Sequence, residues 1–190
     1  GLGGFSLQID DPAFCHEATL YWQEVSAEAG TPMIAMIDEI GPWFRGLDHD
    51  AREDMNNQDS VRALVLWGNL MAGGGGVEWY FGAHNPHNDL GMEDWRSRDR
   101  AFTWTGKALK FFQEHVPFAE MESNDSIVTT GHYCLAKAGE AYLIYLPFGG
   151  ETVLDLSRTD GEFKVKWFAA SSGVLTEGES IPGGMTVVTR

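Results

Sequence analysis

The chain has 190 residues, and its 13 Lys and Arg against 28 Asp and Glu give a formal net charge of −15. Hydrophobic residues make up 43% of it and aromatic residues 12%, which is enough for a buried core. So acidic a chain lacks the clustered Lys and Arg that bind nucleic acid, and no apolar run reaches the roughly 18 residues of a membrane span. We therefore expect one or two globular domains, with neither nucleic acid nor a membrane as partner.

The first predicted element is a helix that begins at Asp11 and ends before Gly30. Asp11 is a suitable N-cap, and Pro12 fits the first helical position, where its missing N–H is not needed. Apolar side chains then recur at helical spacing at Phe14, Ala18, Tyr21 and Val25. Gly30, followed by Pro32, closes the helix.

A continuous apolar run, residues 33–37, follows this helix. Such a run is typical of a strand buried on both faces, as in a parallel sheet covered by helices. It ends in Asp38 and Glu39, and a polar loop comes next. That loop contains Trp43, Arg45, Asp48 and Asp50.

Two further helices flank a second short strand. Residues 61–71 predict a helix that the glycine run 73–76 stops, and residues 77–82 predict a strand. A third helix is predicted over 95–116. Its apolar positions are Trp95, Phe102, Leu109, Phe112 and Val116. The alternation of helices and strands predicts an α/β fold.

The chain changes character near residue 120. Residues 121–126 are polar and aperiodic, so we predict two domains, 1–120 and 121–190. Short strands are predicted at 142–146, 153–156 and 163–167, with turns at 149–150, 160–161 and 172–173. Of these turns, Asp160-Gly161 is the strongest hairpin signal. The second domain is therefore predicted to be a small antiparallel β-sandwich.

Glu39 is the main candidate for chemistry, because ligands of α/β folds collect at the carboxyl ends of the strands. A carboxylate there is either catalytic or substrate-binding, or it is an ordinary loop or capping acid. Asp38 competes with it, since side chains alternate along a strand and only one of the two faces inward.

Aromatic residues accompany Glu39. Trp79 and Tyr80 end the second predicted strand, and Trp43 lies in the loop after Glu39. The rings of Trp79 and Tyr80 suit stacking on the apolar face of a sugar, although core packing is at least an equal explanation for one of the two. The loop residues Trp43, Arg45, Asp48 and Asp50 would either line a polar site or belong to a solvated loop.

We predict no metal and no cofactor. His84, His87 and Asp89 have a spacing that invites a metal, but the same residues are typical of a turn. The glycine run follows a helix and precedes a strand, the wrong order for a phosphate-binding loop. Cys15 and Cys134 are predicted to be buried apolar side chains.

Several stretches carry a resemblance to a known family. Residues 32–41 (Pro-Met-Ile-Ala-Met-Ile-Asp-Glu-Ile-Gly) resemble the seventh strand of bacterial retaining glycoside hydrolases built on a (β/α)8 barrel. Residues 66–82 resemble the following helix and the eighth strand, and residues 93–99 the last barrel helix. From Tyr133 onward the chain is similar to the small β domain named as a collagen-binding domain of a collagenase.

The resemblance implies that the chain comprises the last βα units of a TIM-type barrel followed by the β-sandwich. It makes Glu39 the nucleophile and Trp79 the sugar platform. From their positions near Glu39, we also predict Tyr80, Trp43 and Asp38 as substrate-binding residues. Retaining hydrolysis needs a second carboxyl about 5 Å away, which the family carries on its fourth strand and this chain lacks. The resemblance thus implies an inactive C-terminal fragment with a carbohydrate substrate, from a protein exported to the periplasm or beyond, although no signal peptide is evident here.

Other functions stay open. One alternative is a non-catalytic module that binds polysaccharide or collagen through residues 121–190. Another is an intact small α/β domain with a different role. A partial barrel leaves an open sheet edge and uncovered helix faces, so we also expect the chain either to pair with a second copy or to repack.

Overall fold

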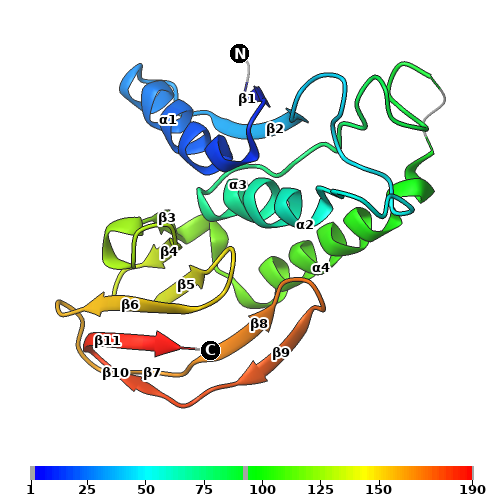
Figure 1. Cartoon of the computed structure of the whole chain (residues 1–190). Helices are drawn as coiled ribbons and strands as arrows, with labels where there is room; N and C mark the ends of the chain where they lie inside the picture. Colours follow the sequence, from blue (N-terminus) through cyan, green and yellow to red (C-terminus); the bar gives the residue numbers. More distant parts are fainter. Residues whose placement is uncertain (1–2, 92–93, 190) are drawn as a thin grey trace. The chain divides into compact units, whose positions relative to one another are not determined.

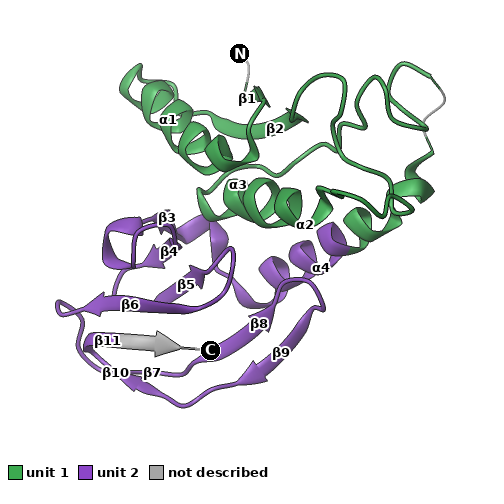
Figure 2. Ribbon diagram, viewed as in Figure 1, with its two compact units in different colours: residues 1–103 green, residues 104–190 purple. Residues whose placement is uncertain are grey.

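The computed structural model describes residues 3–91 and 94–189, so Glu93 of the predicted last barrel helix lies outside the described residues. The chain divides into two compact units, residues 1–103 and 104–190 (Figure 2). The division falls within helix α4 (Asp99–His115), of which the part from Trp104 onward belongs to unit 2. The domain boundary at 120/121 stays a prediction. The fold class is confirmed at the level of a mixed helix-and-sheet protein.

Unit 1 is built on parallel strands. Strand β1 (Gly4–Ile9) pairs in parallel with β2 (Ile34–Ile40), and a parallel bridge joins Ile37 of β2 to Val77 (Figure 1). β2 is therefore the central one of three parallel segments. The sequence analysis missed β1, and among the described residues the predicted strand 77–82 pairs only through Val77.

Two helical segments of unit 1 pack against β2. The first comprises η1 (Pro12–Phe14) and α1 (Cys15–Glu28), and its predicted start is confirmed, since the Asp11 carboxylate accepts the Ala13 N–H at 3.0 Å. The second comprises α2 (Gln58–Val61), a π-helical turn η2 (Arg62–Leu66) and α3 (Trp67–Met71). In the π turn the Trp67 N–H donates to the Arg62 carbonyl five residues earlier. Both α1 and α3 contact β2.

The predicted buried face of α1 is wrong. Phe14 and Tyr21 are each 57% exposed, while the buried side chains are Cys15, His16, Thr19 and Ser26. Polar residues can occupy this face because their hydrogen bonds are satisfied. His16 Nδ1 lies 2.8 Å from the Gly68 carbonyl oxygen, and the Thr19 hydroxyl donates to the Cys15 carbonyl at 2.7 Å.

The prediction that β2 is buried on both faces is also wrong. Ala35 and Ile37 are fully buried, whereas Ile34 and Met36 on the opposite face are exposed. Helices α1 and α3 supply cover for one face only, so the alternate side chains of β2 remain uncovered.

The third predicted helix exists as η3 (Trp95–Arg98) followed by α4. Of its predicted apolar positions, Trp95, Phe102 and Leu109 are exposed and Phe112 is buried. The buried face instead comprises Ala101, Trp104, Ala108, Phe111 and Phe112. Within unit 2, the Phe111 ring stacks on Phe168 with centroids 4.1 Å apart, and Trp104 Nε1 donates to the Ser171 carbonyl at 3.0 Å. These contacts explain why the buried face of this helix differs from the predicted one.

The described strand pairings of unit 2 are antiparallel. A three-stranded sheet comprises β3 (Glu122–Ser123), which follows the turn η4 (Phe118–Glu120), and then β4 (Tyr133–Lys137) and β5 (Ala141–Tyr145), which follow the turn η5 (Asp125–Ile127). The other pairs are β6 (Glu151–Leu156) with β11 (Gly184–Thr189), β7 (Glu162–Phe163) with β10 (Ile181–Pro182), and β8 (Lys166–Ala169) with β9 (Val174–Glu177).

Two details of the predicted strands need correction. The strand 163–167 is split into β7 and β8, because its two ends pair with different partners and the Val165 carbonyl accepts the Gly178 N–H at 2.9 Å. The Asp160-Gly161 turn joins β6 to β7, which pair with other strands, so the hairpin is wrong. The 172–173 turn is confirmed, with Gly173 at φ 78° between β8 and β9.

Candidate functional site

Glu39 lies at the carboxyl end of β2, the central parallel segment of unit 1. The β1–β2 register shifts between Leu7 and Gln8, so that Leu7 faces Ile37, Gln8 faces Glu39, and Asp38 has no partner residue. This bulge re-aims the side chains at the end of the strand. Within the described part of the chain, no hydrogen bond or ion pair occupies the Glu39 carboxylate.

Asp38 is directed toward the neighbouring strand. One oxygen of its carboxylate accepts a hydrogen bond from the Ser6 hydroxyl of β1, and the other is buried. Asp38 and Glu39 therefore differ in their partners and not in burial, since Asp38 is bonded to Ser6 while both side chains are half-buried at the strand end. The substrate-binding role of Asp38 stays a prediction.

Tyr80 is influenced by the negative charge of Glu39, and it is hydrogen-bonded to the loop that follows β2. Burial raises the pKa of the Tyr80 phenol, and the negative charges of Glu39 and Asp89 raise it further. The Tyr80 hydroxyl donates a hydrogen bond to the Trp43 carbonyl. Tyr80 is thus bonded to the loop that carries Trp43.

The loop after β2 and the segment after Val77 run side by side. The Leu47 N–H donates to the Tyr80 carbonyl at 2.7 Å, the Ala83 N–H to the Trp43 carbonyl at 3.1 Å, and the His84 N–H to the Phe44 carbonyl at 3.0 Å. Asn85 adds a side-chain hydrogen bond to the Arg45 carbonyl. The main chains of residues 43–47 and 80–84 therefore hold each other in place.

Glycine permits this close approach. Gly46 has φ 56° and Gly82 has φ 75°, both in the region that side-chain-bearing residues rarely adopt. A Cβ on Gly82 would lie 2.2 Å from the Arg45 carbonyl oxygen, so the two loops could not meet if either residue carried a side chain.

A buried ion cluster supports the same loop. Asp48 is fully buried and accepts hydrogen bonds from Arg45 Nη2 at 2.8 Å and Arg52 Nη1 at 2.6 Å. Burial alone would raise the pKa of Asp48, but hydrogen bonds from Arg45 and the Asn57 N–H, with the charge of Arg52, lower it below its ordinary value. Arg45 and Asp48 thus take part in holding the loop, while Asp50 is exposed and bonds Gln58.

Arg98 is a second buried cation that the sequence reasoning missed. Its guanidinium donates to the Pro86 carbonyl at 2.7 Å and the Leu47 carbonyl at 3.2 Å, and it lies 4.4 Å from the centre of the Phe81 ring. Burial lowers the pKa of Arg98. The hydropathy pattern does not predict this burial, because a single arginine in a polar segment is normally expected at the surface.

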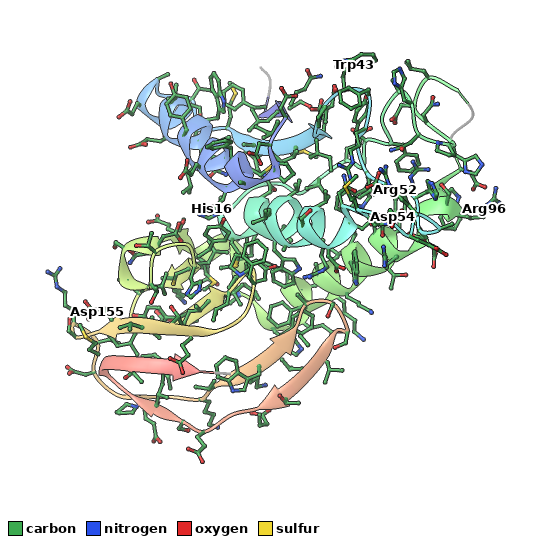
Figure 3. The ribbon with its side chains drawn as sticks, viewed as in Figure 1. His16, Trp43, Arg52, Asp54, Arg96 and Asp155 are labelled. Carbon is green, nitrogen blue, oxygen red and sulfur yellow. The ribbon has the colours of Figure 1, made fainter. Side chains whose placement is uncertain are left out.

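The predicted aromatic residues differ in exposure. Trp79 is packed, with 8% of its surface exposed, and Tyr80 is half-buried. Trp43 is 58% exposed and projects from the loop after β2 (Figure 3). Its ring meets Phe44 and His84 edge to face, with centroids 5.8 Å and 5.2 Å apart. The sugar-binding roles of these three predicted residues are untested by the geometry, but only Trp43 displays a large open surface.

The residues with metal-like spacing are used in other ways. His84 packs on Trp43, His87 is exposed, and Asp89 accepts the Phe81 N–H at 2.6 Å. No three His, Cys, Asp or Glu side chains gather as a metal site in residues 3–91 and 94–189. The same residues include no helix long and apolar enough to cross a membrane. Both cysteines are buried and unpaired as thiols, as predicted.

No protein-family model matches the chain, and no curated protein matches it. Among solved structures it is similar to a glycoside hydrolase family 5 protein from Bacteroides vulgatus, with a TM-score of 0.70 at 17% identity over 100% of this chain and 48% of that one. A second protein, described as a glycoside hydrolase, gives a TM-score of 0.65 at 12% identity over 90% of this chain and 42% of that one. The chain thus spans about half the length of the structures it matches. Its fold is that of the corresponding part of these glycoside hydrolases.

Proposed function

We propose that the chain is the C-terminal part of a retaining glycoside hydrolase that acts on poly- or oligosaccharide, with Glu39 as its nucleophile. The observation that carries the proposal is the position of Glu39 at the carboxyl end of the central parallel strand, in a fold shared with glycoside hydrolases.

An incomplete (β/α)8 barrel accounts for the uncovered surfaces of unit 1. A closed barrel needs eight parallel strands, and β1, β2 and the Val77 segment would correspond to the last three. In a complete barrel, the side of β2 that carries the exposed Ile34 and Met36 would face the interior. The fold match to about half of a longer hydrolase supports the same view.

The proposed reaction is a double displacement. The Glu39 carboxylate attacks the anomeric carbon, the bond from that carbon to the leaving oxygen breaks, and a second carboxylic acid gives its proton to that oxygen. Water then hydrolyses the glycosyl ester of Glu39 with the second carboxylate as base. That second group would come from the other part of the barrel, so the 190-residue chain alone is expected to be inactive.

Mechanism-based labelling tests the proposal. The chain extended by the coding sequence upstream of Gly1 is treated with activated 2-deoxy-2-fluoro glycosides, and the labelled peptide is identified by mass spectrometry. We expect the label on Glu39, no label in Glu39→Gln, and full labelling in the control Glu78→Gln, an exposed carboxylate on the adjacent segment. A label on another carboxylate would exclude Glu39 as the nucleophile. Turnover by the 190-residue chain would contradict the proposal that the second carboxyl group comes from outside this chain.

A binding role for residues 121–190 is the second candidate. The antiparallel strands support a small sandwich, and Phe148, in the turn between β5 and β6, is 80% exposed. Such a ring is suited to contact polysaccharide or collagen. Titration of the chain and of Phe148→Ser with collagen peptides and a glycan panel tests this role. If the chain binds neither kind of ligand, a structural role for residues 121–190 is favoured. Export of the parent protein belongs to the same proposal, and a signal peptide upstream of Gly1 would support it.

A further inference from the structure

The alternation of buried and exposed side chains along β2 breaks at its carboxyl end. Up to that point it is regular, with Ile37 on the face covered by helices and Met36 on the open face. Strict alternation would place Glu39 on the covered face and Ile40 on the open one. Instead Ile40 is buried, while Asp38 and Glu39 are both half-buried. The alternation is therefore reset between Ile37 and Ile40.

A bulge at Asp38 produces this change. Leu7 of β1 faces Ile37, and the next residue, Gln8, faces Glu39, so Asp38 is the extra residue of the longer strand. Paired residues of neighbouring strands place their side chains on the same face, and Gln8 is exposed. The bulge thus brings Glu39 to the open face of the sheet, away from the face that α1 and α3 contact.

Ser6 of β1 holds the extra residue in place. Its hydroxyl donates a hydrogen bond to one carboxylate oxygen of Asp38. Ser6 is exposed and pairs with Met36, so it lies on the open face just before the register shifts. The other Asp38 oxygen is buried and has no hydrogen-bond partner in residues 3–91 and 94–189. Among the described residues, the Ser6 hydroxyl is therefore the group that fixes this carboxylate.

We propose that Ser6, acting through Asp38, is a positioning residue for Glu39. This rests on the proposed function, in which Glu39 attacks the anomeric carbon. The hydrogen bond pins the bulge, and the bulge sets the place of the Glu39 carboxylate at the end of the strand. Ser6 need not touch the substrate for this role, because a displacement of a reacting group by about 1 Å can cost about a hundredfold in rate.

Amide hydrogen exchange of the 190-residue chain tests whether Ser6 pins the bulge. The Gly41 N–H donates to the Ile9 carbonyl at 2.9 Å beyond the bulge, and the Gly75 N–H donates to the Ala35 carbonyl at 2.9 Å before it. We expect Ser6→Ala to speed exchange at Gly41 by about fivefold or more, the loss of one hydrogen bond, and to leave Gly75 unchanged. Ser6→Thr keeps the hydroxyl and should restore slow exchange. Unchanged exchange at Gly41, or equal acceleration at both glycines, would overturn the pinned bulge.

Labelling of the extended chain with activated 2-deoxy-2-fluoro glycosides tests the effect on Glu39. We expect Ser6→Ala to lower the rate constant for labelling by about tenfold or more. The reagent concentration that gives half of the maximal rate should stay the same, because Ser6 positions the nucleophile and does not bind the sugar. Ser6→Thr should retain most of the rate. An unchanged rate constant in Ser6→Ala, or an effect on the half-maximal concentration alone, would overturn the positioning role.

Ser60→Ala is the matched control. Ser60 is also an exposed serine of unit 1, and its hydroxyl donates to the Asn57 carbonyl at 2.9 Å. We expect its loss to change neither exchange at Gly41 nor labelling of Glu39. Absence of label in the unchanged protein would mean that the proposed function fails, and the role of Ser6 in the reaction with it. Normal labelling that Ser6→Ala does not slow would overturn the positioning role alone, so the two failures are distinguishable.

Discussion

Gly46 and Gly82 face each other so closely that a Cβ on Gly46 would lie 2.4 Å from the Gly82 backbone nitrogen. Both glycines have positive φ, so each position resists a side chain for two independent reasons, backbone conformation and space. The contact joins the loop that follows Glu39 to the segment that carries Tyr80.

We predict that Gly82→Ala lowers the free energy of unfolding by at least about 2 kcal/mol, because it combines a left-handed backbone with a clash against the Arg45 carbonyl. Gly106→Ala is the control, since Gly106 lies in α4 with no atom within 4 Å of the added Cβ. That change should stabilise the protein by about 0.5–1 kcal/mol. Urea unfolding measures both, and equal effects of the same sign would contradict the close approach.

Asp48→Asn should destabilise the protein by about 3 kcal/mol, because it leaves the Arg45 and Arg52 guanidinium groups without their buried counter-charge. The folded-state pKa of Asp48 is lowered, so its contribution is fully present above its ordinary pKa of about 4 and is lost as pH falls through the folded value. The free energy of unfolding, measured from pH 7 to pH 2, should therefore fall less steeply at the acid end in Asp48→Asn than in the unchanged protein. Asp59→Asn should change little, because the Asp59 carboxylate is 73% exposed and lies 3.7 Å from Arg62.

Phe111→Ala should cost about 3–4 kcal/mol, because Phe111 is buried and stacked on Phe168. Phe102→Ala on the same helix removes an exposed ring and should cost less than about 1 kcal/mol. Thermal unfolding compares the two variants. A larger loss for Phe102 would mean that the helix buries the predicted apolar positions, among them Trp95, Phe102 and Leu109.

The two thiols should be inert in the folded protein. Burial raises the pKa of Cys15 and of Cys134 to about 12, so neither is a thiolate at pH 8. We expect no reaction with a disulfide reagent at pH 8 and release of two equivalents after addition of denaturant, in line with the two free cysteines. Rapid modification of the native protein would show that at least one thiol is accessible.

The chain should associate with itself at high concentration, because Phe14, Tyr21 and Trp22 are exposed together on one helical segment. Sedimentation velocity should show a rise in mean mass with concentration. The double change Tyr21→Glu and Trp22→Glu should abolish the rise, whereas Glu24→Gln on α1 should not. A monomer at every concentration would argue against this surface as a site of pairing.

The elements of this fold that have local signals were predictable. The Asp11 cap, the stop at Gly30 and the position of Glu39 at the end of a strand all follow from residues within a few positions of each other. Strand β1 also had a signal, the alternation of Phe5, Leu7 and Ile9 with polar residues, which was overlooked.

The helix faces were not predictable in the same way. His16 and Thr19 are buried because Gly68 and Cys15 supply hydrogen-bond partners, and hydrophobic spacing cannot show such partners. At the candidate site, His84 was missed as a neighbour of Trp43, because their contact joins two loops about 40 positions apart in the chain. The split between β7 and β8 likewise depends on distant partners.

The π turn at residues 62–66 has a consequence for how this protein tolerates changes in chain length. Asn69, just after it, donates to the Thr19 hydroxyl and the Ala35 carbonyl and accepts the Gly76 N–H at 2.7 Å. The turn holds one residue more than the α-helical turn that it replaces, so deleting one of residues 62–66 would leave an ordinary α-helix in which the following residues keep their orientation. Asn69 would then keep its three partners. A one-residue deletion within the regular helix α1 would instead rotate every later residue of that helix by roughly 100°, so it should be more damaging than a deletion in the π turn.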